Sequence, residues 1–303
     1  MEKLNEKNDQ IKHREKKRIK QFEITREDEP REKQFSILGF TIWRIIIYFI
    51  IYSILGYVIE TIFGLITKGV LESRKNFLYG PFCCIYGIGA LVVILGLQKF
   101  KKNNYIIFFG GVIIGSIVEY LISLIGEFIF HIKWWDYSNM PFNINGRICL
   151  AFSFLWGILA IYLMCHIHPN IDKFINKFSP KTIKIVAIIG MIYMLISLFV
   201  TSFALEIFFA RLVQDYNLEL KDMDSYIIKA TYIYNIPKIK QISDKYFSNE
   251  KMLKTFPNIK VTSKSGEIIH VRDILKDIQP YYVRFFTPKI SVNQDGNLVK
   301  VSN

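Results

Sequence analysis

Five long apolar stretches constrain this chain more than any other feature of its sequence. A helix needs about 20 mostly apolar residues in a row to cross the hydrocarbon core of a bilayer. Each stretch is close to that length or exceeds it, and hydrophilic, lysine-containing segments separate them. The sequence therefore predicts an all-α, polytopic membrane protein with five transmembrane helices, at residues 37–66, 79–97, 105–130, 148–165 and 183–210.

Two other readings of the apolar stretches fail. A cleaved signal peptide does not fit the first one, because 36 strongly charged residues precede it and its apolar length exceeds that of a signal sequence. A transmembrane β-barrel needs strands of about 10 residues with alternating polarity, and a segment such as IVAIIGMIYMLISLFV does not alternate. The helical interpretation stands for all five stretches.

Two tails flank the predicted transmembrane domain of residues 37–210. Residues 1–36 mix charges at short range and contain too few apolar side chains to form a core, so we expect a cytoplasmic tail that is disordered or a solvated helix. Residues 211–303 predict an extramembrane tail that is a small α+β unit or only partly ordered. Within it, NIKVTSKSGEIIHVRDILKDI indicates a short hairpin across Lys264, Ser265 and Gly266, followed by a helix.

The distribution of basic residues predicts the orientation. Lysine and arginine favour the cytoplasmic side of a membrane protein, and the first tail and the second and fourth loops are the basic segments. The first and third loops then lie outside together with the C-terminal tail, in a multi-pass protein of the cell membrane. The formal net charge of +13 is spread over tails and loops, which favours membrane lipids as partners and gives no patch typical of nucleic-acid binding.

Carboxylates inside the apolar stretches are the candidate functional residues. A carboxylate at the centre of a bilayer costs at least ~2.5 kcal/mol and usually faces a cavity or a partner. In the predicted topology all of them lie toward the end where the first and third loops bring two arginines. We expect an ion or substrate pathway there. Two structural roles remain open as alternatives: the side chains could extend to the membrane interface, or they could form a buried ion pair. The glutamates are Glu60, Glu119, Glu127 and Glu206, and the pathway candidates are Glu60, Arg74, Glu119, Glu127, Asp136 and Arg147.

Helical spacing refines this expectation. Glu119 and Glu127 are eight positions apart, so they are separated by ~12 Å along a helix and ~80° around it. They could line one hydrated groove, in which Arg147 pairs with a carboxylate of the preceding helix. Glycines one turn before the acids, at Gly56 and at Gly111 and Gly115, predict tight helix packing.

The third loop, HIKWWDYSNMPFNINGRICL, is unusually polar and aromatic. Its rings are typical of the aromatic belt at a membrane interface, and Asn145 with Gly146 indicates a turn. Asp136 and Arg147 lie at the predicted acidic end, so we interpret the loop as the lid of an acidic vestibule. The interfacial residues that we single out in it are Trp134, Trp135, Tyr137, Asn143 and Asn145.

Signatures of catalysis and of cofactor binding are absent from the sequence. It contains no G-x-x-x-x-G-K-[ST], no H-E-x-x-H and no G-x-S-x-G. The four cysteines have no metal-ligand spacing, and His166 and His168, followed by Pro169, are better read as the end of a helix than as a metal site. We therefore expect no metal, no cofactor and no enzymatic activity of a recognisable kind.

Three segments resemble a bacterial family of ABC-transporter type IV permease-like membrane proteins: SRKNFLYGPFCCIYGIGAL, IVEYLISLIGEFIFHIKWWDYS and FNINGRICLAFSFLWGIL. The resemblance covers residues 40–210 and departs from the family pattern at Cys84, where a proline is usual, and at Lys75 and Asn76, where a glycine is usual. It implies a permease-like subunit whose ATPase is a separate chain. The positions that it matches are Glu60, Arg74, Gly80, Pro81, Tyr86, Gly87, Glu119, Glu127, Trp135, Asp136, Tyr137, Asn143, Gly146 and Arg147.

Three functions are compatible with these observations. The first is a transport-related membrane subunit that works with a separate ATP-binding subunit on an unknown substrate. The second is an intramembrane enzyme acting on lipid or envelope precursors, since acids gather at one interface, although no activated nucleophile is visible. The third is a non-catalytic scaffold or sensor. The sequence leaves the number of copies in the assembly open, a homo-oligomer included.

Overall fold

The computed structural model describes residues 36–130, 132–221, 224–278, 282–287, 290–292 and 298–300. Its internal contacts divide the chain into residues 1–42 and residues 43–303. All but the last residue of the charged tail predicted for 1–36 lie outside the described residues. In the first unit, β1 (Ser36–Ile37) and β2 (Phe40–Thr41) form an antiparallel hairpin. Leu38 and Gly39 make its turn, both with positive φ.

Four helices in the described part of the chain are long and apolar enough to cross a membrane. They correspond to the first, third, fourth and fifth predicted stretches. The second stretch forms a shorter helix, α3 (Cys84–Leu97), which the 3₁₀ turn η1 (Gln98–Phe100) extends. The five-span count therefore stays a prediction. The four long helices are α2 (Ile42–Lys68), α4 (Asn104–Phe130), the continuous helix Leu150–Ile175 and α7 (Pro180–Tyr216).

Two predicted helix ends are wrong. The first helix begins at Ile42 and not at residue 37, because the hairpin takes up the preceding residues. The fourth helix does not end near His166: α5 (Leu150–Tyr162) continues through a π-helical turn, η2 (Leu163–Ile167), into α6 (His168–Ile175). Pro169 lies in the first turn of α6. The missing N–H of proline does little harm at the start of a regular helical segment, and the π turn provides such a start.

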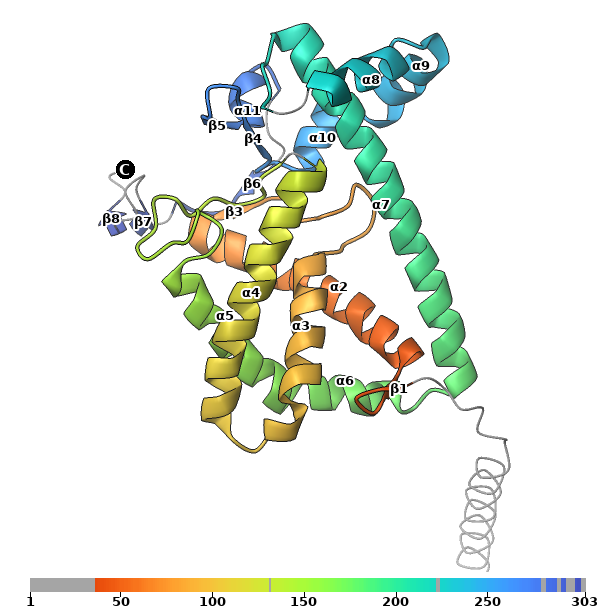
Figure 1. The fold of residues 1–303 in the computed structure, drawn as a ribbon, viewed down its shortest axis with the longest axis vertical. Coiled ribbons are helices and arrows are strands. Elements are labelled where there is room, and N and C mark those ends of the chain that lie inside the picture. The colour runs from red at the N-terminus through yellow and green to blue at the C-terminus, as the bar shows by residue number, and fades with distance from the viewer. Residues whose placement is uncertain are drawn as a thin grey trace, which may run out of the picture. The chain divides into compact units, whose positions relative to one another are not determined.

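Helix α4 lies beside α3 and α5 (Figure 1), and glycines lie where helices approach closely. A Cβ atom added to Gly111 would lie 2.4 Å from the Cβ of Ala160, and one added to Gly115 would lie 2.4 Å from the Cβ of Trp156. Both partners are on α5, so the predicted tight packing of this glycine step is confirmed. Gly56 plays the same part between α2 and α3, where an added Cβ would lie 2.3 Å from the Cβ of Tyr86.

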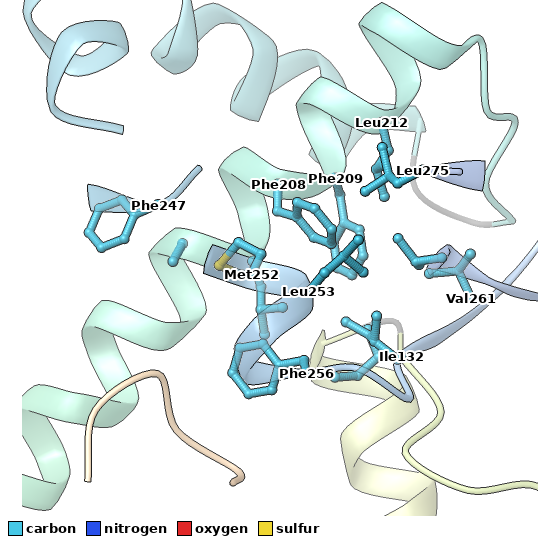
Figure 2. Packing of buried hydrophobic residues seen from close by; sticks show 14 of the residues in the cluster. Ile132, Phe208, Phe209, Leu212, Phe247, Met252, Leu253, Phe256, Val261 and Leu275 are labelled. Atoms are coloured by element: carbon cyan, nitrogen blue, oxygen red, sulfur yellow. The ribbon is translucent and has the colours of Figure 1, made fainter. Parts of the chain in front are cut away.

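The residues after α7, up to residue 278, form a helical and β-stranded region around one apolar core (Figure 2). The core joins Phe208 and Leu212 of α7 to Met252 and Leu253 of α10, and it includes Ile132 from the third loop. β4 and β5 form the hairpin expected around Lys264 to Gly266. The elements of this region are α8 (Asp224–Tyr234), α9 (Pro237–Tyr246), α10 (Asn249–Thr255), β4 (Lys260–Thr262), β5 (Ile268–His270), α11 (Val271–Ile274), β6 (Val283–Arg284), β7 (Ile290–Val292) and β8 (Leu298–Lys300).

Backbone pairing fastens this C-terminal region to the first and third loops. β6 pairs antiparallel with β3 (Val70–Leu71), which follows α2 directly. In the third loop, the backbone of Lys133 exchanges hydrogen bonds with that of Lys260 at 3.0 and 3.2 Å. β7 and β8 pair only with each other among the described strands. The first loop, the third loop and the C-terminal region therefore meet at the same ends of α2 and α4.

Candidate functional site

A cavity of about 750 Å³ lies where the first loop, the third loop and the C-terminal region meet the helices. Residues of α2, α3, α4 and α5 line one part, which we call the deep part; Lys68, the two loops, residues 255–260 and His270 line the other part, which we call the mouth. Most of the residues singled out from the sequence lie on its wall. These are Glu60, Arg74, Glu119, Trp134, Trp135, Asp136 and Tyr137.

Glu119 of α4 is the most buried carboxylate of the cavity, with 4% of its surface exposed. Tyr137 donates its hydroxyl hydrogen to one carboxylate oxygen (3.0 Å), and Trp156 of α5 donates its indole N–H to the other (2.9 Å). Burial and the neighbouring Glu119 raise the pKa of Tyr137, so this hydroxyl stays a neutral donor. The ring of Tyr137 stacks on that of Phe152 at 4.8 Å, which fixes its position.

Glu60 of α2 is held in the same manner. It accepts a hydrogen bond from the hydroxyl of Tyr86 at 2.7 Å. The close approach of Tyr86 depends on Gly56, one turn before Glu60. The rings of Tyr86 and Trp156 lie 5.3 Å apart, so a continuous set of aromatic side chains connects the donors of Glu60 to those of Glu119. The structure thus brings these two predicted carboxylates to one cavity.

Arg74 at the mouth pairs with a carboxylate that the sequence reading missed. Its guanidinium lies 2.7 Å from Glu72, which is 8% exposed. Glu72 also accepts from Asn258 (3.0 Å) and from Lys68 (3.4 Å). Burial alone raises the pKa of Glu72, but Lys68, Asn258 and Arg74 together bring it below its usual range. Glu72 therefore stays ionised and ties the first loop to the C-terminal region.

Glu127 and Arg147 form an ion pair that is not part of the cavity wall. The Nη2 atom of Arg147 lies 2.5 Å from Glu127, and its Nη1 atom donates to Ser123 at 3.0 Å. The pairing of Arg147 with a carboxylate of the preceding helix is confirmed. Glu119 lines the cavity and Glu127 does not, so the shared groove for the two glutamates stays a prediction.

The third loop is held by its own polar side chains. Asp136 accepts hydrogen bonds from the backbone and the hydroxyl of Ser138 at 3.2 and 2.6 Å. Asn143 caps the backbone of the same loop, and Asn145 donates to the hydroxyl of Tyr120 at 2.9 Å. Asn145 and Gly146 both have positive φ, as the predicted turn requires. Much of the polarity of this loop therefore serves its own conformation.

The indoles of the loop face the helices. Trp135 donates its N–H to the backbone oxygen of Arg147 at 2.9 Å. An added Cβ on Gly126 of α4 would lie 2.1 Å from the Trp134 ring, so that ring packs directly on the helix. Both tryptophans line the cavity. The interpretation as a membrane belt remains a prediction for these rings, and their observed place is the cavity wall.

Several residues of the mouth could not have been found from the sequence. Ser73, Lys260 and His270 line the cavity, but Lys260 and His270 come from a tail with no recognisable motif. Only the paired strands and the shared apolar core bring them there. The fourth candidate glutamate, Glu206, is half-buried on α7 and does not line the cavity.

A second polar cluster lies at the other end of α2. Asp172 of α6 accepts hydrogen bonds from Arg44 (3.3 Å) and from the hydroxyl of Tyr48. His168, one turn before Asp172, shares a hydrogen bond with the hydroxyl of Tyr52 at 2.8 Å. The continuation of the fourth helix through η2 and α6 puts these residues beside α2. The sequence did not predict this cluster, because we expected the fourth helix to end near His166.

Among the described residues, no group of three or more His, Cys, Asp or Glu side chains could hold a metal ion. The chemistry available in the cavity is that of two carboxylates held by aromatic donors, with basic side chains at the mouth.

Comparison with known proteins identifies one family. Residues 47–202 match the family described as "Putative ABC-transporter type IV". No curated protein and no solved structure matches the chain. The matched region contains most of α2, most of α7, and every cavity residue except those after α7.

Proposed function

Because the chain belongs to the family described as "Putative ABC-transporter type IV", we propose that it is a permease-like subunit of a transporter, working with a separate ATPase. In this proposal it is a multi-pass protein of the cell membrane. The cavity binds the substrate between the apolar helices and the C-terminal region, which covers the mouth.

The observation that carries the proposal is the placement of Glu60 and Glu119. Each carboxylate lies in a long apolar helix, faces the cavity and is held by aromatic donors. Ionisable side chains at membrane depth are expensive and usually mark a pathway for a substrate or an ion. A purely structural pair would be expected to bond to an opposite charge, as Glu127 does with Arg147, and not to border a cavity.

The energy source belongs to another chain in this proposal. The sequence has no P-loop, which nucleotide-binding subunits use to hold phosphates. The predicted topology places Lys99 of the η1 turn, Lys101 and Lys102 directly after it, and the start of α7 on the cytoplasmic side. These segments are the places where an ATPase would dock. The C-terminal region lies at the opposite ends of α2 and α4, so it stays available for covering the cavity.

Co-purification from native membranes tests the proposal. The full-length tagged chain should recover a nucleotide-binding subunit, and Lys101→Glu with Lys102→Glu should reduce that recovery while the chain stays folded. Recovery of the chain without any ATPase, together with unchanged transport on its deletion, would overturn the permease role.

The same preparation addresses the enzyme alternative. Glu119→Gln should impair transport in the proposed role. A change in lipid or envelope composition with transport intact would instead assign the carboxylate to catalysis.

A further inference from the structure

The cavity carries opposite charges at two depths. Glu60 and Glu119 line the deep part, and the mouth contains four basic side chains and one acidic side chain, Asp136. Glu60 and Lys68 are eight residues apart on α2, which puts them about 12 Å apart along the helix. The basic residues of the mouth are Lys68, Arg74, Lys75 and Lys260.

The guanidinium of Arg74 lies near the acidic part. It lies against Gly64 of α2, where an added Cβ would be 2.8 Å from Nη2 and 3.1 Å from Nε. Gly64 is one helical turn from Glu60, a rise of about 6 Å. A positive and a negative group therefore face the cavity within about one turn of each other.

Three buried polar atoms of residues that line the mouth have no hydrogen-bond partner among the described residues. They are the Oγ of Ser73, the Nε of Arg74 and the Nδ1 of His270. A buried polar atom without a partner is unfavourable, and a ligand with several acceptor oxygens would supply partners to all three. Glu72 accepts a hydrogen bond from the Nη2 atom of Arg74, and not from its Nε atom.

The mouth has a positive electrostatic environment. Burial lowers the pKa of His270, and the charges of Lys260 and Arg272 add to the lowering. Burial also lowers the pKa of Lys260, with Lys133 and Arg272 acting in the same direction and Asp136 opposing them. An anionic group placed here would find cationic partners in Lys75 and Lys260, and it would share Arg74 and Lys68 with Glu72.

The deep part of the cavity favours a cationic group of the ligand. Its carboxylates are surrounded by Tyr86, Tyr137 and Trp156. Carboxylates together with aromatic faces are the surroundings that recognise ammonium groups. A purely anionic ligand would be repelled by this part, and a purely cationic one by the mouth.

One wall of the cavity is apolar and belongs to the helix surfaces. Ile59 and Phe63 of α2 and Phe152, Leu155 and Leu159 of α5 line it. Each of these side chains is only partly buried, so the wall continues onto the outer surface of the apolar helices. An acyl chain attached to the ligand could pass along it into the bilayer.

We infer that the cavity binds a zwitterionic amphiphile, with its ammonium group between Glu60 and Glu119 and its phosphate at Ser73, Arg74 and His270. This is the headgroup chemistry of ethanolamine phospholipids. The inference rests on the proposed function in taking the cavity as the substrate site, and it names the class of substrate.

Lipid binding to the purified full-length protein tests the inference. Native mass spectrometry in detergent would compare phosphatidylethanolamine with phosphatidylglycerol, which has the phosphate and lacks the ammonium. We expect the zwitterionic lipid to bind at least tenfold more tightly. Equal binding of the two lipids, or binding of neither, would overturn the inference.

Variants test which residues bind the ammonium group and which bind the phosphate. Glu60→Gln should weaken phosphatidylethanolamine by about tenfold to a hundredfold and leave phosphatidylglycerol unchanged. Arg74→Gln should weaken both. The matched control is Glu206→Gln, a half-buried glutamate outside the cavity, which should change neither. Loss of both lipids in Glu60→Gln, in a protein with wild-type thermal stability, would contradict the assignment of the ammonium group to Glu60.

A soluble competitor distinguishes the sources of the headgroup. Phosphoethanolamine that displaces the lipid supports the headgroup contacts and points to a water-soluble zwitterion as sufficient ligand. Failure to compete, with the lipid preference intact, supports the headgroup contacts within a membrane lipid. Both results are independent of ATPase recovery, so a chain that binds the lipid without an ATPase retains the inference and loses only the permease role.

Discussion

Charged residues lie in apolar surroundings at both ends of α2, but their surroundings differ between the two ends. At the start of the helix, Arg44 and Tyr48 donate hydrogen bonds to Asp172, and Tyr52 shares a hydrogen bond with His168. Toward its end, Glu60 and Arg74 face an open cavity and are held by different neighbours. The first arrangement joins two helices through mutual hydrogen bonds. The second leaves charged groups directed at a space that protein does not fill.

This difference separates a structural cluster from a candidate site. Burial of charge alone does not distinguish the two ends, because both are partly or fully buried. What differs is the cavity: Glu60 and Arg74 line it, and the hydrogen-bonded residues at the start of α2 do not. Changes at the first end should therefore affect stability, and changes at the second should affect ligand binding.

The largest stability effect is expected from Asp172→Ala. The change removes the acceptor shared by Arg44 and Tyr48, and leaves a partly buried guanidinium without its ion pair. We expect the free energy of unfolding to fall by about 2 to 3 kcal/mol, measured by thermal or denaturant unfolding in detergent. Unaltered lipid binding in the remaining folded protein supports the separation of the two ends; loss of lipid binding at wild-type stability contradicts it.

Packing between α4 and α5 should give the next largest effect. Gly115→Ala places a methyl group against Trp156, which also donates to Glu119, so we expect a loss of about 1 to 3 kcal/mol and weaker ligand binding. Gly96→Ala is the matched control, because its added Cβ would only touch Ile114 at 3.4 Å. It should be neutral or slightly stabilising. Equal effects of the two changes on unfolding would show that the tight contact is unimportant.

A smaller, pH-dependent effect is expected from Glu72→Gln. Because the folded state lowers the pKa of Glu72 below its ordinary value of 4.5, the ionised side chain stabilises the fold fully above that pH. The contribution is lost as the pH falls through the folded-state pKa. The wild type should exceed the variant by about 1 to 2 kcal/mol near neutral pH, and the two should converge in acid. A difference independent of pH would rule out the ion pairs as its source.

Much of the fold could be predicted from the sequence, because apolar length is a local property. Four of the five stretches became long apolar helices, and the glycine steps packed as expected. Errors arose where local signals compete. Pro169 indicates a helix end in sequence, but the π turn before it lets the helix continue to Ile175.

The site could be predicted only in part. Glu60 and Glu119 stand out because a carboxylate is rare in an apolar helix, and both line the cavity. Glu127 has the same local signal, yet it pairs with Arg147 outside the cavity wall. Lys260 and His270 have no local signal, since strand pairing with distant segments places them at the mouth.

The most direct test compares the thermal unfolding midpoint of wild-type and Glu60→Gln protein in detergent, with and without phosphatidylethanolamine. A ligand that binds only the folded state raises the midpoint. The wild type should gain several degrees on addition of the lipid, while the variant should match the wild type without lipid and gain little with it. An equal gain in both proteins, or a low midpoint of the variant without lipid, would show that Glu60 is a structural residue and that the cavity is not the binding site.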